Sequence, residues 1–354
     1  MHRRFRRLMF VALCLAPLVS SPLRAATIGE VAAKIKPLTP QERLNYLVKG
    51  ARGEGELVYY GTLPIDEFLP LARVFNVRYH SLPLQHYFSP RDGILSRTLT
   101  EARGGRYAVD VVQVDLSYGY QLLNANLVQP YVIPGANQFY EGTYDPNGFW
   151  HSMYYLTTAL IYNSNALKPE QAPKTYDELL NAAWKGKMVF DPEAGYILAA
   201  LEEAWGREKA LAYLTKLSKQ DLSYRRGGTL TTQVVSSGEF PIGIAINGET
   251  SAAIRDRGAP LGFKVLAPTI VKPEGLFLAK NAPHPHAALL FVEWVLSQEA
   301  QSFLATTLGK GSAMKGVGSK YKEFALQPDF VVGPKLGANL QTYIQDFRKV
   351  MNAP

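Results

Sequence analysis

Short apolar runs alternate with amphipathic segments from residue 56 onwards, and this alternation limits the possible folds more than any other feature. "ELVYYGT" (56–62) and "VDVVQVD" (109–115) are typical of strands. Between them, Phe68, Leu71 and Phe75 recur at the spacing of one helix face. Strands that alternate with helices predict a parallel sheet with crossover helices. We therefore expect an α/β fold.

Local signals mark the ends of several predicted helices. The segment 94–105 stops at two glycines, a typical helix end. Pro70 predicts that the helix around it begins late or bends. Further along, Thr175 and Glu178 have the spacing of a capping box. A long helix is predicted after Pro285.

A second series of strands, at 188–191 and 240–247, follows in the middle of the chain. The strand 240–247 ends at the turn Asn247-Gly248-Glu249, and a helical run comes next. A buried strand that opens onto a polar turn and a helix start is where α/β folds usually place a ligand. The sequence therefore predicts a ligand site at this turn.

Residues 1–25 have the pattern of a secretory signal peptide. They hold five arginines, no acid, an apolar run from Leu8 to Val19 and small residues at the end. That run is shorter than the roughly 20 residues that cross a bilayer. Cys14, the only cysteine, lies in it as an ordinary apolar residue or, alternatively, as a lipoprotein acceptor. We expect cleavage after Ala25 and a periplasmic mature chain without a thiol.

Residues 26–49 are expected to form an N-terminal helical extension. Thr39 is suited to cap a helix that begins at Pro40, with Leu47 and Val48 on its buried side.

The charge balance argues against a nucleic-acid partner. The 354 residues include 38 basic and 30 acidic ones, and the five arginines of residues 1–25 leave 33 basic residues in the remainder. Nucleic-acid binding needs a stronger basic excess or a basic stripe. No later segment is apolar enough to span a membrane, so we expect no membrane insertion. The length predicts two domains.

No catalytic motif is present in the sequence. It contains no Gly-x-Ser-x-Gly, His-Glu-x-x-His or Gly-x-x-x-x-Gly-Lys pattern. His284 and His286 flank Pro285, which is typical of a helix-entry turn, with a metal-binding pair as the alternative. We expect no enzyme, no cofactor and no bound metal. The only acid–base pair available to an enzyme is Asp115 with Glu249.

Several blocks of the chain resemble extracellular solute-binding proteins of bacterial ABC importers. These are "KTYDELLNAAWKGKMVFDP" (174–192), "GEFPIGIAING" (238–248) and "KNAPHPHAALLFVEWVLSQEAQ" (280–301). "GELVYYGT" (55–62) is similar to the family's first strand, and "LQTYIQDFRKVM" (340–351) to its closing helix. The most similar branch includes ferric-ion-binding proteins and relatives for phosphonates, thiamine and other small anions.

The resemblance implies a two-lobe periplasmic-binding-protein fold. Two crossover hinge strands would join the lobes, which close over a ligand in the cleft between them. Lobe one would comprise residues 50–155 together with 272–354, and lobe two residues 156–271. The crossings are expected near residues 156–158 and 267–268.

The resemblance also implies a set of ligand-binding residues. In this family, the loops after the strands bring helix starts to the cleft, and a helix start is a ready anion site. A turn or capping role outside the cleft is the alternative at each position. Arg225 and Arg226 could pair with a ligand carboxylate or phosphonate. The implied residues are Tyr60, Gly61, Thr62, Asp115, Ser117 and Tyr118 in lobe one, and Glu193, Gly195, Tyr196, Arg225, Arg226, Gly228, Thr229, Asn247 and Glu249 in lobe two.

The iron-binding signature of the ferric branch is missing from this chain. In that branch, two adjacent tyrosines follow the strand equivalent to 240–247, whereas here the turn 247–250 reads Asn-Gly-Glu-Thr. The branch's histidine after the first strand is absent too. A small organic anion or a chelated metal therefore fits better than bare ferric iron. Oxygen ligands for a different iron site could come from Glu249, Tyr60, Tyr118 and Tyr196.

The sequence thus predicts the periplasmic solute-binding component of an ABC importer. It would capture a small organic anion or oxyanion, such as a carboxylate or phosphonate, and deliver it to a membrane permease. Ferric iron or a ferric chelate is the alternative ligand, and a secreted enzyme on the same scaffold is the alternative of another class. The expected partners are the ligand and the permease, and a monomer suffices for delivery.

Overall fold

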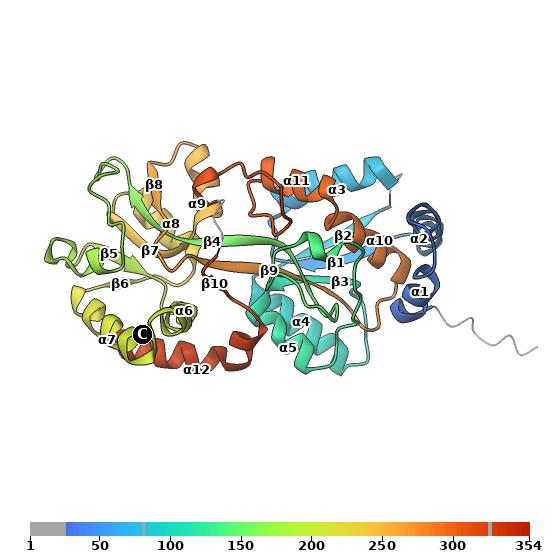
Figure 1. Ribbon diagram of the computed structural model, residues 1–354, viewed down its shortest axis with the longest axis horizontal. Coiled ribbons are helices and arrows are strands. Elements are labelled where there is room, and N and C mark those ends of the chain that lie inside the picture. Colours follow the sequence, from blue (N-terminus) through green and yellow to red (C-terminus); the bar gives the residue numbers. More distant parts are fainter. Residues whose placement is uncertain (1–25, 80–81, 325–327) are drawn as a thin grey trace, which may run out of the picture.

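The computed structural model describes residues 26–79, 82–324 and 328–354. Two α/β lobes lie side by side along the long axis of the molecule, and strands β4 and β9 run between them (Figure 1). The expected α/β class is confirmed. The expected signal peptide, with Cys14, lies outside the described residues. Within the described part, no helix is both long enough and apolar enough to cross a membrane.

Lobe one is built on three parallel strands, as the alternation predicted. β1 (Leu57–Gly61) lies between β2 (Leu84–Phe88) and β3 (Val111–Asp115). The helix that contains Pro70 begins at Ile65, so the expected late start does not occur. The helices of this part are α3 (Ile65–Tyr79), α4 (Arg91–Arg103) and α5 (Leu116–Asn124).

Lobe two repeats the pattern with β5 (Met188–Phe190) between β6 (Ser223–Tyr224) and β7 (Ile242–Asn247). These three strands are parallel, and two of them are the strands predicted at 188–191 and 240–247. β8 (Leu261–Lys264) pairs antiparallel with β4. The helices are α6 (Gly195–Trp205), α7 (Arg207–Leu217), α8 (Gly228–Ser236) and α9 (Gly248–Asp256).

The crossing strands β4 (His151–Asn163) and β9 (Ile270–Leu278) are antiparallel partners that serve both lobes. β4 pairs with β9 up to Thr157 and with β7 from Thr158 onwards. β9 pairs with β3 on its other side. The first crossing therefore lies where the sequence placed it, and the second begins just after the expected residues 267–268.

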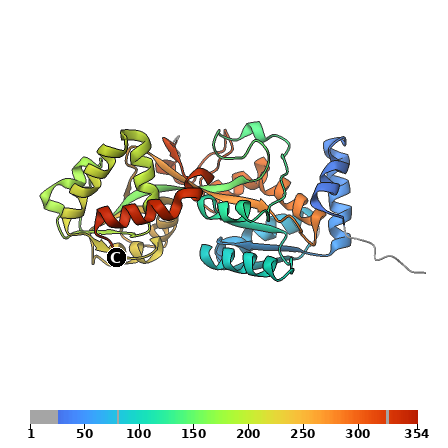
Figure 2. The same ribbon diagram turned by 90° about the horizontal axis from the view of Figure 1, so that it is seen from below.

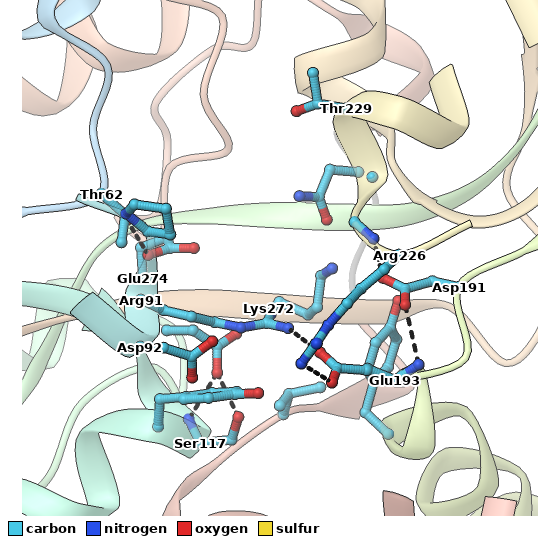
Figure 3. Close-up of a pocket in the computed structure, with 18 of the residues that line it drawn as sticks. Thr62, Arg91, Asp92, Ser117, Asp191, Glu193, Arg226, Thr229, Lys272 and Glu274 are labelled. Carbon is cyan, nitrogen blue, oxygen red and sulfur yellow. Dashed lines mark hydrogen bonds and ion pairs between the residues drawn. The ribbon is translucent and has the colours of Figure 1, made fainter. Parts of the chain in front are cut away.

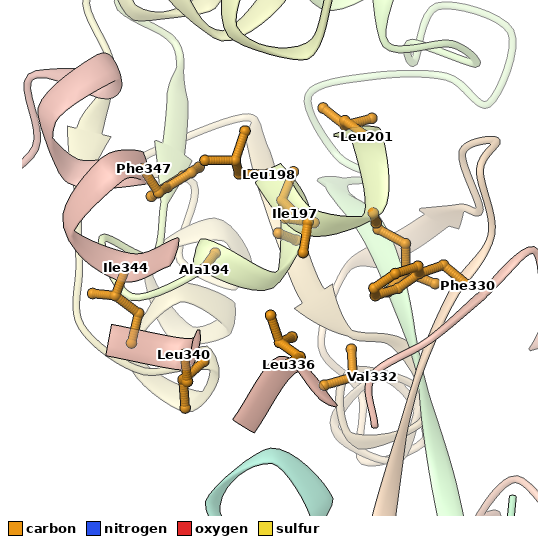
Figure 4. Close-up of a cluster of buried hydrophobic side chains, with 14 of the residues drawn as sticks. Ala194, Ile197, Leu198, Leu201, Phe330, Val332, Leu336, Leu340, Ile344 and Phe347 are labelled. Carbon is orange, nitrogen blue, oxygen red and sulfur yellow. The ribbon is translucent and has the colours of Figure 1, made fainter. Parts of the chain in front are cut away.

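The C-terminal helix α12 (Pro334–Met351) connects the lobes a third time, after β10 (Phe330–Val331) has paired with β9. Figure 2 shows it running beneath the molecule toward lobe two. The sequence assigned this helix to lobe one, whereas it packs on α5 of lobe one and on α6 and α7 of lobe two. The reason is its apolar face, which meets the apolar face of α6 at residues such as Leu198 and Phe347 (Figure 4).

The N-terminal extension forms α1 (Ile28–Ile35) and α2 (Pro40–Glu54), which pack on α10 (Pro285–Val295). Thr39 caps α2 and Pro40 opens it, as predicted. α2 runs beyond the expected end of the extension at residue 49.

The two histidines beside Pro285 enter α10, as expected for a helix-entry turn. His284 Nδ1 lies 2.9 Å from Asp110 Oδ2, and His286 Nδ1 lies 2.6 Å from Glu54 Oε1. The second contact ties the N-terminal extension to lobe one.

Two predicted helices are altered by local backbone contacts. The long helix after Pro285 is interrupted because the Ser297 hydroxyl caps a new helix, α11 (Gln298–Thr306). Thr175 does accept a hydrogen bond from the Glu178 N–H, but only short 3₁₀ turns follow it. The 3₁₀ turns are Ala136–Gln138, Asp177–Leu180, Ala182–Trp184, Ser218–Gln220 and Lys322–Phe324.

The close packing of α6 on α12 predicts that Gly195→Ala destabilises the protein. A Cβ at Gly195 would lie 2.7 Å from the Ile344 nitrogen and 2.8 Å from the Tyr343 carbonyl carbon, so the helix backbone would have to move. We expect a loss of about 1–3 kcal/mol in the free energy of unfolding, measured by urea denaturation.

Gly53→Ala is the matched control for this prediction. Gly53 lies inside α2, and a Cβ there meets nothing within 4 Å. Alanine is the better helix former by about 1 kcal/mol, so this variant should be neutral or more stable. Equal effects of the two substitutions would contradict the packing argument.

Candidate functional site

A cleft of about 400 Å³ lies between the lobes, and both walls contribute polar side chains (Figure 3). Lobe one supplies the residues that follow β1, β2 and β3, and lobe two those that follow β5, β6 and β7. The carboxyl ends of parallel strands open at the same edge of a sheet, so these loops converge. Lys272 and Glu274 of the crossing strand β9 form the floor of the cleft.

Three helices begin at the cleft without a side-chain cap among the described residues. The residues before α4, α8 and α9 are Pro90, Gly227 and Asn247, and none of their side chains accepts a hydrogen bond from the first turn. The first N–H groups of a helix lack partners within it and carry partial positive charge. Gly227 has a φ of 90°, which glycine adopts without strain. The backbone itself therefore offers donors for an anion.

Glu193, just before α6, lies among three arginines. Its carboxylate is 3.4 Å from Arg91 of lobe one, 2.5 Å from Arg226 and 3.5 Å from Arg348 of α12. Arg91 also lies over the ring of Tyr118, 4.4 Å from the ring centroid. Each guanidinium has five N–H donors, more than one shared carboxylate can accept. Arg91 and Arg226 line the cleft, so their remaining donors can face a ligand anion there.

A hydrogen-bond network fixes Glu274 at the floor of the cleft. Gln113 Oε1 accepts the backbone N–H groups of Thr62 at 2.9 Å and Leu63 at 3.1 Å, which turns its amide nitrogen toward Glu274. That nitrogen donates to Glu274 Oε2 at 2.5 Å, and the Thr62 hydroxyl donates to the same oxygen at 3.2 Å. Burial raises the pKa of Glu274 to about 7, and the charge of Asp115 adds to the increase.

The two tyrosines that line the cleft are both engaged by neighbours. The Tyr196 hydroxyl donates to the Ala245 carbonyl at 3.0 Å, and Lys272 lies 4.8 Å from its ring centroid. Burial raises the pKa of Tyr118, which opposes phenolate formation, while Arg91 acts the other way. Across the described residues, no group of three or more His, Cys, Asp or Glu is arranged to hold a metal ion.

The structure brings ten of the residues implied by the sequence to this cleft. Five loops from both lobes contribute them, so residues far apart in the chain share one cavity. Their contact with a ligand stays a prediction. The ten are Thr62, Asp115, Ser117, Tyr118, Glu193, Tyr196, Arg226, Gly228, Thr229 and Asn247.

Tyr60, Gly61 and Arg225 were also implied, but they do not line the cleft. The buried Tyr60 hydroxyl donates to the Glu101 carboxylate of α4 at 3.1 Å. Arg225 pairs with Glu239 at 2.9 Å instead. Thr62 and Arg226 lie in the loops that follow β1 and β6, whereas the side chains of Tyr60 and Arg225 have partners away from the cleft.

Gly195 and Glu249 lie outside the lining as well. Gly195 packs on α12, and Glu249 is buried beside the crossing strand β4. The Glu249 carboxylate accepts the Thr157 N–H at 2.7 Å and the Thr157 hydroxyl at 2.8 Å. Asp115 lines the cleft and Glu249 does not, so the acid–base pair that the sequence offered to an enzyme does not face one cavity.

Five charged residues at the cleft were not expected from the sequence: Arg91, Asp92, Asp191, Lys272 and Glu274. Asp191 ends a predicted strand and could have been found from that position. Arg91 follows β2, whose mixed polarity hides it from a periodicity search. Lys272 and Glu274 lie within a strand, so no turn signal marks them.

Residues 86–329 match the family model described as bacterial extracellular solute-binding protein. The chain belongs to this family. Among curated relatives, iron uptake protein A1 of Synechocystis is 28% identical over 188 residues, or 49% of this chain and 52% of the relative. The Fe(3+)-binding periplasmic protein of Serratia marcescens is 26% identical over 181 residues, or 47% and 52%. This solute-binding protein spans about half the length of the curated relatives it matches.

Solved structures of similar fold cover more of the chain. Iron-bound HitA from Pseudomonas aeruginosa superposes with a TM-score of 0.70 at 20% identity, over 83% of this chain and 99% of HitA. AfuA from Actinobacillus pleuropneumoniae, with fructose-6-phosphate bound, gives a TM-score of 0.70 at 20% identity, over 85% and 99%. At such identities the likeness shows the fold, and it confirms the expected two-lobe periplasmic-binding-protein architecture.

The burial of Glu249 predicts a specific pH dependence of stability. Burial raises its pKa from 4.5 to about 7. A carboxyl whose pKa is higher in the folded state stabilises the fold below its unfolded pKa and loses that contribution as the pH rises through the folded value. Glu249→Gln keeps the size and shape of the side chain but removes the group that titrates. Between pH 5 and pH 8, the Tm of this variant should therefore fall by about 3 °C less than the Tm of the parent protein.

The exposed Glu203 supplies the control for this measurement. Glu203→Gln should leave the parent's pH dependence of Tm unchanged, since that side chain is in water in both states. Parallel Tm profiles for Glu249→Gln and the parent would show that Glu249 does not titrate in this window.

Proposed function

We propose that this solute-binding protein is the capture component of an ABC importer and binds a small organic anion or an oxyanion in the interlobe cleft. The observation that carries the proposal is the set of three uncapped helix starts beside Arg91 and Arg226. Backbone N–H groups and guanidinium groups together form the donor set that carboxylates and phosphates need. The cleft volume is in the range of small-molecule sites.

The family and its relatives support the transport part of the proposal. Extracellular solute-binding proteins act outside the cytoplasm, which agrees with the signal-peptide pattern of residues 1–25. A membrane permease is the proposed second partner, and a monomer with a closable cleft is sufficient for delivery. The similar proteins are binding proteins, which favours capture over catalysis on this scaffold.

Phosphorylated or carboxylated ligands are favoured by the geometry of lobe two. The start of α8 contributes Gly227, Gly228 and Thr229 to the cleft lining, directly after Arg226 in the chain. Figure 3 shows Arg226 and Thr229 on the same wall of the cleft. A structural relative, AfuA, has fructose-6-phosphate bound. We therefore place the anionic group of the ligand at the start of α8.

A ferric chelate is the second candidate ligand. Two curated relatives are named for iron, and a structural relative from Trichodesmium was solved with iron and citrate. A chelate would bring its own oxygen ligands, which agrees with the absence of a three-residue metal-binding group among the described residues. Its carboxylates could use the same helix starts.

A thermal-shift screen of residues 26–354 would test the proposal. The protein would first be stripped of ligand by partial unfolding and refolding. The probes would be inorganic phosphate, sulfate, citrate, fructose-6-phosphate and ferric citrate. A ligand at 100 times its Kd adds about 2.7 kcal/mol to stability and raises Tm by several degrees. A shift with ferric citrate alone, together with visible absorption, would favour the iron chelate.

The two adjacent arginines provide a sharp prediction for the anion site. Arg226 lines the cleft, whereas Arg225 pairs with Glu239 outside it. Arg226→Gln should weaken binding of the anion that gives the largest shift by about tenfold or more, because it removes a charged hydrogen-bond donor. Isothermal titration calorimetry measures this directly.

Arg225→Gln is the control for Arg226→Gln, since both remove one positive charge at neighbouring positions. Its affinity should stay within about threefold of the parent value, because exposed charges interact weakly through water. Equal losses in both variants would place the anion away from α8 and contradict the proposed site.

A further inference from the structure

Two buried carboxyl groups lie side by side at the floor of the cleft. Asp115 at the end of β3 and Glu274 on β9 are direct partners in the antiparallel register of these strands. Side chains of such partners project from the same face of the sheet, with Cβ atoms about 5 Å apart. Each residue is 8% exposed, and both line the cleft. Like charges in this position repel each other unless a donor group lies between them.

The two acidic residues that lobe two contributes to the cleft, Asp191 and Glu193, already have hydrogen-bond donors from the protein. Glu193 is bonded to arginines, and Asp191 accepts the backbone N–H groups of Glu193 at 2.9 Å and Gly227 at 3.3 Å. In contrast, among the residues that the structure describes, Asp115 and Glu274 each accept hydrogen bonds from the protein through one carboxylate oxygen only. Asp115 Oδ1 caps α5 through Ser117, and Glu274 Oε2 receives Gln113 and Thr62.

The second oxygen of each of these two carboxyl groups remains open toward the cleft. In the described parts of the chain, no hydrogen bond reaches Glu274 Oε1 or Asp115 Oδ2. The Gln113 network prevents Glu274 from turning away, because Gln113 is itself held by two backbone N–H groups. Both residues line the cleft, so a ligand can supply the donor that the protein does not.

We propose that Asp115 and Glu274 form an acceptor pair that selects ligands with a hydroxyl or ammonium donor a short distance from their anionic group. This inference rests on the proposed function, in which the anion lies at the start of α8 on the opposite wall. Figure 3 shows Glu274 and Ser117 on one side of the cleft and Arg226 and Thr229 on the other. A ligand with two different ends therefore spans the cleft in one orientation.

The raised pKa of Glu274 agrees with this arrangement. Burial and the charge of Asp115 favour the protonated acid when no donor is present. Several titratable and charged groups lie near Glu274. They are Asp115 from β3, Lys272 from β9, Arg91 from α4, and the buried tyrosines Tyr59 from β1 and Tyr154 from β4. Lys272 and Arg91 lower the pKa, but less than burial raises it. An ammonium donor would reverse the balance and favour the carboxylate.

Three phosphate esters of matched size test the acceptor pair. Ethyl phosphate carries no donor at its end, 2-hydroxyethyl phosphate carries a hydroxyl, and 2-aminoethyl phosphate carries an ammonium group. The two donor esters should bind the stripped protein about tenfold or more tightly than ethyl phosphate, as measured by calorimetry. Comparison of the two donor esters then tells a hydroxyl subsite from an ammonium subsite.

Glu274→Gln and Asp115→Asn should abolish this preference. In the first variant, the glutamine oxygen still accepts from Gln113, and its amide nitrogen turns toward the cleft. In the second, asparagine still caps α5, so at least one variant is expected to fold. The donor esters should then bind within about threefold of ethyl phosphate. Glu141→Gln is the control, because it removes an exposed carboxylate of lobe one that is not part of the cleft lining, and it should retain the preference.

The outcomes separate this inference from the function on which it rests. If all three esters bind the parent equally, the acceptor pair is refuted and the anion site stands. The same holds if Glu274→Gln and Asp115→Asn keep the tenfold preference. If none of the three esters binds at millimolar concentration, the phosphate site at α8 is refuted, and the acceptor pair with it.

Discussion

Strands β4 and β9 pass from one lobe to the other as hydrogen-bonded partners, and the sheets of both lobes are built onto them. β4 pairs with β9 up to Thr157 and with β7 from Thr158, while β9 also pairs with β3. The crossing is therefore two strands wide and continuous with both cores. β9 also forms the floor of the cleft, so Lys272 and Glu274 lie on a strand that both lobes share.

The helix α12 adds a third connection between the lobes, and some of its side chains reach the cleft. Leu340 and Ile344 line the cavity, and Gly337 lies so close to α5 that a Cβ would be 2.4 Å from the Ser117 carbonyl oxygen. On the cleft side, the Arg91–Glu193 ion pair joins the two walls. Lobe movement must therefore exchange this ion pair for contacts with water or ligand. A ligand anion that engages Arg91 from lobe one and the start of α8 from lobe two would bridge the same gap.

The cleft combines two kinds of electrostatic environment in a small volume. Open helix starts and arginines favour an anion at lobe two, whereas the Asp115–Glu274 pair at the floor favours a donor. Either feature alone would suit many small molecules. Together they favour a ligand with two different ends, because reversing it would place its anion against two carboxyl groups. The same division offers a bare ferric ion few suitable ligands from the protein.

The sequence by itself determined the strand–helix alternation and the start of α2, with its cap at Thr39 and Pro40 as the first helical residue. It also determined the loops from which ten cleft residues come. These features depend on local backbone preferences and on where the carboxyl ends of strands lie. Only the tertiary structure decided that Glu249 is buried against Thr157, that α12 packs on α6, and that Asp115 meets Glu274. These contacts join residues more than 90 positions apart. Strand register and helix packing set them, and neither leaves a periodic signal in a single chain.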